Sequence, residues 1–264
     1  MPTTYPATPT TTPPTSPLGD MNPLQLATQV RANAKEARLT SHVLETQLAT
    51  ITTDHLAFLA TYLNAEITSR RASARARLIA GAHLPTIKTL DGYDWTRLTL
   101  PEGLTPTNLA ALDFLTRAED LICYGDVGCG KTHLATALIH TACHNGIKAR
   151  FTTAADLVMN LRKAKNEARL DRELTLLARF ELLAIDELGY LPIDPEGARL
   201  LFQVINNTYE KTSLIITTNI EFSRWGTIFG DDNIAAAIID RLIHHGHLIR
   251  HTGTSWRVQN ALMK

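Results

Sequence analysis

The chain lacks three features that would each point to a class of protein: paired cysteines, an excess of one charge and a long apolar run. Its 3 cysteines are an odd number without a C-x-x-C pair, which argues against a disulfide framework or a zinc site and favours the reducing cytoplasm. Lys and Arg total 26 and so do Asp and Glu, so any contact with nucleic acid must come from local basic patches. No apolar run approaches the roughly 18–20 residues that cross a membrane, and we expect no membrane partner.

Glycine is missing from residues 21–80, whereas residues 1–20 are rich in threonine and proline. This tail has almost no charge and holds half of the prolines, so it cannot bury a core and we predict that it is disordered. It has neither the basic start nor the apolar centre of a signal peptide. Globular patterning begins at Met21, and we expect either that the tail is dispensable or that Met21 is the natural start.

The glycine-free stretch predicts a helical module. Its apolar positions recur close to the helical period, at Leu44, Leu48, Ile51, Phe58 and Tyr62. Gly81 and Pro85 are expected to end the last helix. We therefore predict a small N-terminal helical domain over residues 21–84.

The remainder, residues 85–264, is predicted to be an α/β domain. It opens with a connector over 85–118, which contains turn residues, aromatics and an amphipathic helix over 108–117. Apolar β-like runs then alternate with helical stretches, at 121–124, 149–152, 182–185, 214–217 and 248–250. Strands separated by helices indicate a mainly parallel sheet that is covered on both faces.

The pattern G-x-x-x-x-G-K-[ST] is matched without a mismatch by residues 125–132, GDVGCGKT, between an apolar strand and a helix. Such a loop closes backbone N–H groups around the β- and γ-phosphates of ATP or GTP, helped by the positive end of the helix. Lys131 is expected to reach phosphate oxygens, and the Thr132 hydroxyl to ligate Mg²⁺. The predicted nucleotide-binding residues here are Gly125, Asp126, Val127, Gly128, Cys129, Gly130, Lys131, Thr132 and His133.

An acidic pair, Asp186 and Glu187, follows the apolar run at 182–185. We expect Asp186 to hold the Mg²⁺ shell through water, and Glu187 to orient and polarise the attacking water. The next strand leads to Asn219, the candidate sensor of the γ-phosphate or of the attacking water. Thr217 and Thr218 are weaker candidates, and a simple Asn turn is the alternative.

Arg241 lies in a helical stretch beyond that strand. A planar, permanently charged guanidinium suits the negative charge that spreads over the γ-phosphate oxygens during phosphoryl transfer. We predict that Arg241 acts in trans, in the site of a neighbouring subunit. An intramolecular structural pair with Asp240 is the alternative.

Four histidines are clustered near the end of the chain. No carboxylate or cysteine accompanies them in the sequence, and an apolar strand separates the last from the others. Structural or surface roles are therefore favoured over a metal site. They are His244, His245, His247 and His251.

Several motifs follow one another in an order that resembles a known family. They are GDVGCGKTHL, DELGYLP, TTN, FSRWG, DRLIHH and GTSWR, joined by an Arg-rich segment before AHLP and by KTLD. Together they resemble the IstB-like ATP-binding proteins, the helper ATPases of a group of bacterial insertion sequences, which belong to the AAA+ superfamily beside DnaC-type helicase loaders and DnaA-type initiators. The resemblance runs from about residue 22 to the C-terminus. Its departures are small: Thr218 stands where many members have Ser, and Trp256 where Tyr is usual.

The resemblance implies an AAA+ P-loop ATPase core, with a parallel sheet flanked by helices, after a small N-terminal helical domain. The helical lid of AAA+ proteins is expected to be absent or vestigial, and Arg257 matches a second, ATP-sensing arginine. The implied cofactors are ATP and Mg²⁺, with ATP held between the subunits of a homo-oligomer. The implied function is assembly on double-stranded DNA in the bacterial cytoplasm, with recruitment or stimulation of a partner transposase.

Two basic runs are candidates for contact with DNA. The first is Arg70, Arg71, Arg75 and Arg77, for which a solvated helix face is the alternative. The second is Arg162, Lys163, Lys165, Arg169 and Arg172, near the place where an inserted helical element of DnaA-type relatives faces nucleic acid. Nothing resembles a base-reading module, so we expect non-specific binding through phosphates.

A DnaC-like replicative helicase loader is the alternative function, because the ATPase chemistry is shared. The DELGY motif and Trp225-Gly226 favour the transposition helper, and residues 22–80 are short for a helicase-binding domain. A nucleotide-gated scaffold without hydrolysis is a third hypothesis, which the set of Lys131, Glu187 and Arg241 disfavours.

Overall fold

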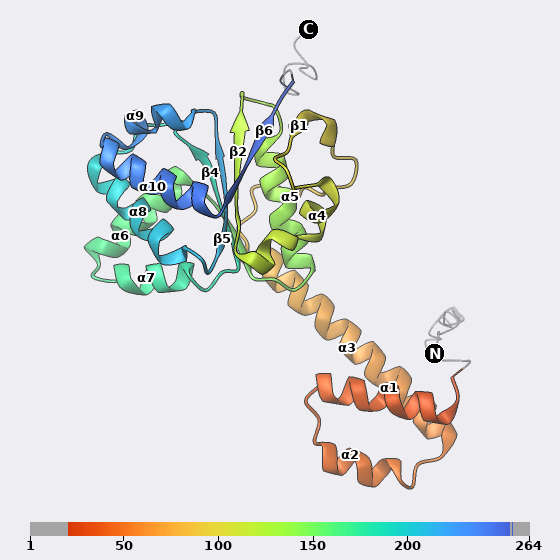
Figure 1. The fold of residues 1–264 in the computed structure, drawn as a ribbon. Helices are drawn as coiled ribbons and strands as arrows, with labels where there is room; N and C mark the ends of the chain where they lie inside the picture. The colour runs from red at the N-terminus through yellow and green to blue at the C-terminus, as the bar shows by residue number, and fades with distance from the viewer. Residues whose placement is uncertain (1–20, 254, 256–264) are drawn as a thin grey trace, which may run out of the picture. The chain divides into compact units, whose positions relative to one another are not determined.

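The computed structural model describes residues 21–253 and Ser255, which fall into two compact units divided between Ala74 and Arg75 (Figure 1). The division lies inside a long helix, α3 (Thr53–Gly81), which ends at the glycine expected to end it. The Thr/Pro tail, Trp256 and Arg257 lie outside the described residues. The expectations of a disordered tail and of an ATP-sensing Arg257 therefore remain predictions.

The N-terminal unit consists of α1 (Pro23–Glu36), α2 (Ser41–Leu48) and the first part of α3. A capping box between Asn22 and Gln25, with a proline at the first turn, starts α1. Residues of α1 and α3 form the small core, and α2 adds only partly buried side chains. The predicted periodicity is wrong at Phe58 and Tyr62, which are 70% and 56% exposed because α3 buries a different stripe. That stripe is Leu56, Ala60, Leu63 and Ile67.

A six-stranded sheet in the order β1-β6-β2-β5-β4-β3 forms the centre of the second unit. All pairs are parallel except that of β1 with β6. The five predicted strands are present, whereas the two-residue β1 lies in the connector and was not predicted. The strands are β1 (Leu98–Thr99), β2 (Asp120–Gly125), β3 (Ala149–Thr153), β4 (Leu182–Leu188), β5 (Ser213–Thr218) and β6 (Gly246–His251).

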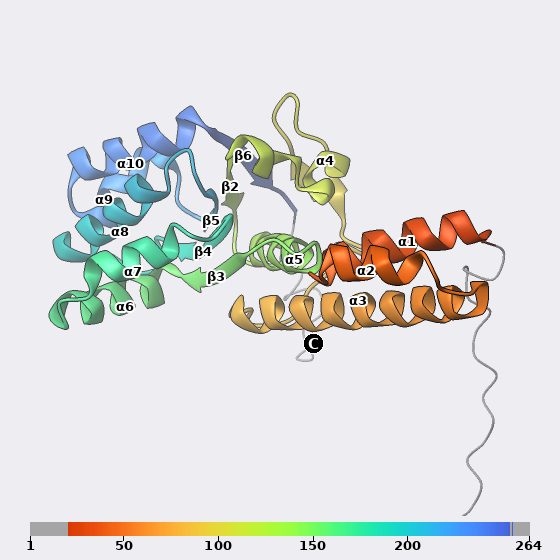
Figure 2. The same cartoon turned by 90° about the horizontal axis from the view of Figure 1, so that it is seen from below.

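Helices cover both faces of the sheet (Figures 1 and 2). One face packs on α4 (Pro106–Ala111) and α5 (Lys131–His144). The other packs on α6 (Ala154–Asn166), α7 (Leu170–Leu177), α8 (Pro195–Thr208), α9 (Trp225–Phe229) and α10 (Asp232–His244). A hydrophobic core lies on each face of the sheet, and successive residues of a pleated strand point into opposite cores. Leu121 and Cys123 face α5, whereas Ile122 faces α10.

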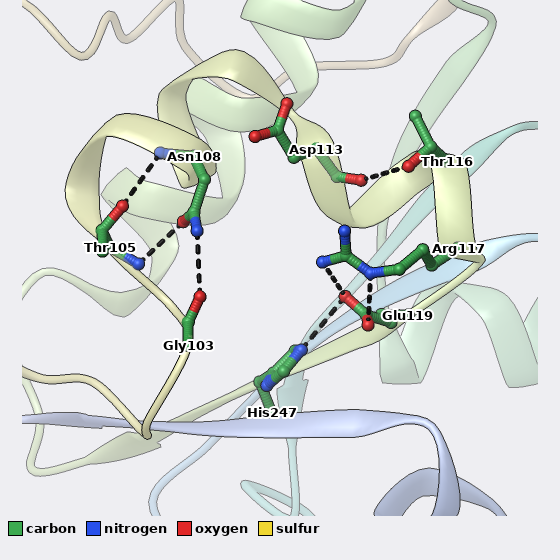
Figure 3. Close-up of polar contacts among 8 residues, drawn as sticks. All are labelled: Gly103, Thr105, Asn108, Asp113, Thr116, Arg117, Glu119 and His247. Atoms are coloured by element: carbon green, nitrogen blue, oxygen red, sulfur yellow. Dashed lines mark hydrogen bonds and ion pairs between the residues drawn. The ribbon is translucent and has the colours of Figure 1, made fainter.

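The helix predicted over 108–117 is broken. A Thr105–Asn108 capping box starts α4, which ends at Leu112 in the left-handed conformation (φ 63°), and the chain continues as the 3-10 turn η2 (Asp113–Arg117). Figure 3 shows the Thr105–Asn108 capping box and also Glu119, which accepts hydrogen bonds from Arg117 and His247 and so ties this turn to β6. The amphipathic pattern was correct, but Leu112 ends α4 and begins η2 in the left-handed conformation, and this local geometry overrides helix propensity.

Because β2, β4, β5 and β6 run parallel, their carboxyl ends meet at one edge of the sheet. In open α/β sheets this edge is where ligands bind. The phosphate-binding loop, the acidic pair Asp186-Glu187 and Asn219 lie at this edge. In the described ranges, no helix has both the length and the apolar character needed to cross a membrane.

Candidate active site

The phosphate-binding loop joins β2 to α5, as predicted. Its three glycines, Gly125, Gly128 and Gly130, have φ of 151°, 82° and 95°, which side-chain-bearing residues rarely adopt. At Gly125 a Cβ would also lie 2.3 Å from the carbonyl oxygen of His251 on β6. No side chain caps the first turn of α5, so its N–H groups stay available for an anion.

Lys131 is the first residue of α5 and is only 6% exposed. Its Nζ donates hydrogen bonds to the carbonyl oxygens of Gly125 (2.6 Å) and Asp126 (2.7 Å). The backbone of the loop therefore surrounds the ammonium group of Lys131. This contact holds one positive charge beside the N–H groups that a phosphate would meet.

Asp186, at the end of β4, is buried and connects three segments. Its Oδ1 accepts hydrogen bonds from the hydroxyls of Thr132 (3.1 Å) on α5 and of Thr217 on β5. The Thr217 hydroxyl in turn accepts a hydrogen bond from the backbone N–H of Glu187 (3.0 Å). The structure thus brings the two predicted acidic residues to the phosphate loop, with Thr217 as the link between them.

Glu187 has an unusual backbone. The pairing of β4 with β5 shifts register between Ile185 and Leu188, and Glu187 in this bulge has φ 61°. A bulge re-aims side chains beside a site, and a left-handed non-glycine residue stores strain of about 1–3 kcal/mol. As a result Asp186 stays buried, whereas Glu187 is exposed and lines the cavity at the phosphate loop.

Asn219 directly follows β5 at the same edge. Its Oδ1 is buried and has no hydrogen-bond partner among the described residues. A buried amide oxygen without a partner is costly, and a water molecule or ligand at this edge would satisfy it. Asn219 is not among the residues that line the cavity at the phosphate loop.

That cavity has a volume of about 710 Å³, and the connector forms one of its walls. Tyr93 packs edge-on against His133 of α5 and against Trp95, with ring centroids 5.3 and 5.0 Å apart. Burial raises the pKa of the Tyr93 phenol, which keeps it neutral. This wall was not predicted from the sequence, although the aromatics of this turn-rich segment were a signal for it. The connector residues in it are Thr86, Lys88, Gly92, Tyr93, Asp94 and Arg97.

His251 supports the loop from β6. It is 4% exposed, its Nδ1 lies 3.4 Å from the carbonyl oxygen of Cys129, and burial lowers its pKa to about 4. The ring is therefore neutral near pH 7 and adds no charge beside Lys131. This agrees with a structural role for His251.

Arg241 lies far from these residues along the sheet. It is one turn before the end of α10, and the chain from there enters the amino end of β6, which pairs with the amino end of β2. The phosphate loop leaves the opposite end of β2. The Arg241 guanidinium donates to the carbonyl oxygen of Ala237 (2.9 Å) and stacks over the Phe202 ring of α8. No ion pair between Asp240 and Arg241 is found in the described part of the chain.

Most of the basic side chains proposed for DNA are paired with acids. Arg70 pairs with Glu66, Arg71 with Glu36, Arg162 with Asp194, Lys165 with Glu196 and Arg169 with Glu167. Over residues 21–253, no ion pair involves the other four. They are Arg75, Arg77, Lys163 and Arg172.

Comparison with known proteins agrees with this geometry. A family model described as IstB-like ATP binding protein matches residues 23–263. The ATP-binding protein of insertion sequence IS5376 from Geobacillus stearothermophilus is 40% identical over 202 residues, 76% of this chain and 80% of that protein. The ATP-binding protein of insertion sequence IS21 from Pseudomonas aeruginosa is 40% identical over 202 residues, 76% of each protein.

Among solved structures, AMPPCP-bound DnaA from Aquifex aeolicus is similar with a TM-score of 0.51 and 16% identity, over 64% of this chain and 51% of that chain. At that identity the likeness shows the fold alone, which is the predicted AAA+ core with a mostly parallel sheet flanked by helices. The family match and the insertion-sequence relatives go further: the chain belongs to the IstB-like ATP-binding proteins.

Proposed function

We propose that this protein is a Mg²⁺-dependent AAA+ ATPase that assembles on double-stranded DNA and recruits or stimulates a partner transposase. One observation carries the hydrolytic part: beside the phosphate loop, Asp186 accepts a hydrogen bond from Thr132 and is linked through the Thr217 hydroxyl to the Glu187 backbone. A chain that only held a nucleotide would not need a strained, exposed Glu187 at the cavity wall.

The residues fit a magnesium ion. The Thr132 hydroxyl and the Asp186 carboxylate are hard oxygen donors 3.1 Å apart, and Mg²⁺ is usually held by one or two such groups together with waters and phosphate oxygens. When bound, Mg²⁺ would neutralise charge on the β- and γ-phosphate oxygens. Thr132 would ligate it directly and Asp186 through water.

The remaining roles belong to the chain itself. Lys131 would exchange its bonds to the Gly125 and Asp126 carbonyls for phosphate oxygens. Glu187 would accept a proton from the attacking water, and the Asn219 amide would hold that water or the γ-phosphate. Glu187→Gln should therefore bind ATP and stall hydrolysis, whereas Lys131→Ala should weaken nucleotide binding and assembly together.

The position of Arg241 supports the proposal that subunits assemble. Within one subunit it lies toward the amino edge of the sheet, and the phosphate loop lies at the carboxyl edge. A head-to-tail contact between subunits would bring the Arg241 of one to the ATP of the next. ATP binding would then favour assembly, and hydrolysis would favour disassembly.

DNA binding is proposed to be electrostatic and non-specific. Charges already paired with Glu or Asp have less to offer a phosphate, so we assign the larger share to Arg75, Arg77, Lys163 and Arg172. The logarithm of the binding constant should fall with the logarithm of salt by roughly 0.9 per neutralised phosphate. A flat salt response would contradict this part of the proposal.

The test is the ATPase rate without DNA, with single-stranded DNA and with duplex DNA, measured together with particle size by light scattering. Stimulation and large particles on duplex DNA are expected for the transposition helper. A preference for single strands without assembly on duplex would favour the DnaC-like helicase loader. Hydrolysis by Glu187→Gln at the rate of the unchanged protein would remove Glu187 from its role.

A further inference from the structure

Away from the phosphate loop, the ends of α8 and α10 bring together three metal-ligating side chains. Glu210 follows α8, His244 ends α10 and His245 caps it, and one ligand atom of each lies within 4.8 Å of the other two. The histidines alone gave no reason to expect a metal. Their carboxylate partner comes from 35 residues before His245 and is supplied only by the fold.

The three side chains are already oriented toward one another. His245 Nε2 lies 2.9 Å from Glu210 Oε1, and the rings of His244 and His245 have centroids 4.4 Å apart. His244 Nδ1 lies 2.9 Å from the hydroxyl oxygen of Tyr209. When Nδ1 carries the proton and donates to that oxygen, Nε2 keeps a free lone pair, which is the arrangement that fixes a metal-binding histidine.

The local field favours a cation. The carbonyl ends of two helices, the 14-residue α8 and the 13-residue α10, meet at this place, and each carries a partial negative charge. The Glu210 carboxylate adds a full negative charge. Arg241, one turn earlier on α10, is directed to the Ala237 carbonyl and the Phe202 ring.

The donor set indicates which ions would fit. Tetrahedral Zn²⁺ with bonds near 2.0–2.1 Å needs ligand atoms about 3.3 Å apart, which small rotations of exposed side chains can reach. The side chains of Glu210 and His245 are 57% and 31% exposed, so they can move and a fourth position stays open to water. Two imidazoles with one carboxylate suit Zn²⁺ or Co²⁺ rather than Mg²⁺ or Ca²⁺.

We propose that Glu210, His244 and His245 form a binding site for a divalent transition-metal ion such as Zn²⁺, with Tyr209 as the residue that orients His244. The ion clamps the end of α8 to the end of α10, the helix that carries Arg241. The site is separate from the nucleotide cavity and does not depend on ATP hydrolysis.

The test is equilibrium dialysis of the full-length protein against Zn²⁺ without nucleotide, with the visible absorption of bound Co²⁺ as a second readout. One ion per chain is expected, with the intense bands of a four- or five-coordinate ion. Glu210→Gln and His245→Gln should each weaken binding at least about tenfold, and Tyr209→Phe should weaken it without changing the stoichiometry. Zn²⁺ should raise the melting temperature of the unchanged protein but not that of Glu210→Gln.

Two matched controls separate this site from other histidines. His247→Gln removes a histidine held by Glu119 in a different network (Figure 3), and His144→Gln breaks the His140–His144 pair on α5. Both should bind Zn²⁺ like the unchanged protein. The proposal is overturned if the unchanged protein takes up no ion, or if Glu210→Gln and His245→Gln bind as well as the controls.

Discussion

At Glu187, backbone strain and the expected chemistry coincide. Its left-handed φ of 61° is a conformation in which asparagine is several-fold more common than most residues. A site that needed only an acidic residue at a strand end would have no reason to keep glutamate there. We infer that the strain is kept because the longer side chain of glutamate places its carboxylate where the site requires it.

This strain gives a stability prediction independent of catalysis. Glu187→Asn and Glu187→Gln both replace the carboxylate with an amide, but asparagine tolerates the left-handed backbone better. We expect both to lose hydrolysis and Glu187→Asn to be the more stable by up to about 1 kcal/mol. Urea unfolding monitored by circular dichroism measures the difference. If Glu187→Gln is equally stable, the backbone carries no such strain.

Thr217 is a second residue whose role is defined by its bonds. It is 1% exposed, and its hydroxyl donates to Asp186 and accepts from the Glu187 N–H. Thr217→Val keeps the shape but leaves the Glu187 N–H without its acceptor and removes one of the two hydrogen bonds to Asp186 Oδ1, so we expect a loss of about 1–3 kcal/mol in stability and slower hydrolysis. Thr217→Ser keeps the hydroxyl and should resemble the unchanged protein in both assays. If Thr217→Val is as stable as the unchanged protein, the hydrogen bonds of this hydroxyl do not stabilise the fold.

At the scale of the elements, the central strand β2 begins with a buried acid. Asp120 Oδ1 accepts a hydrogen bond from the Leu214 N–H (2.7 Å) of β5, and burial raises the pKa of its carboxyl to about 7. The folded state therefore holds a proton that the unfolded chain loses near pH 4. Asp120 stabilises the fold fully below pH 4, and this contribution is lost as pH rises toward 7.

Asp120→Asn removes that titration and can keep the bond to Leu214. The free energy of unfolding of the variant, relative to the unchanged protein, should rise between pH 4 and 7 and level off above. Chemical unfolding at a series of pH values measures it. His251, whose lowered pKa acts in the opposite sense, contributes equally to both proteins and cancels in the difference. A flat difference would mean that Asp120 is not the titrating group.

The sequence was sufficient for the elements whose signal is local. The glycines of the phosphate loop and the apolar runs of five strands follow from backbone and burial requirements that act within a few residues. The Thr217 link, the connector wall at Tyr93 and the pairing of Glu210 with His245 depend on residues distant in sequence, so no local pattern contains them. The broken helix at Leu112 was missed because cap geometry outweighs periodicity there.

At the scale of the whole molecule, the trans role of Arg241 can be tested by mixing variants. Lys131→Ala has a defective loop and an intact Arg241, whereas Arg241→Ala has the reverse, so each alone should be inactive. Mixing them should restore part of the DNA-stimulated ATPase activity, because an intact loop then meets an intact arginine. Phosphate release on duplex DNA measures it.

The matched control mixes Lys131→Ala with Glu187→Gln. Both defects lie on the same side of the proposed interface, so every site keeps one of them and no rescue is expected. Equal rates in the two mixtures would contradict the trans assignment. Full activity of Arg241→Ala alone would do the same.

The separation of Arg241 from the phosphate loop has a consequence for any chain of such subunits that does not close into a ring. One terminal subunit would hold ATP that no arginine reaches, and the other would present an arginine with nothing to act on. Nucleotide in the interior would turn over while nucleotide at one end persisted. The terminal subunit that keeps its ATP would then stay bound for longer, and the polymer would lose subunits preferentially away from that end. This difference would give the assembly a direction along the DNA.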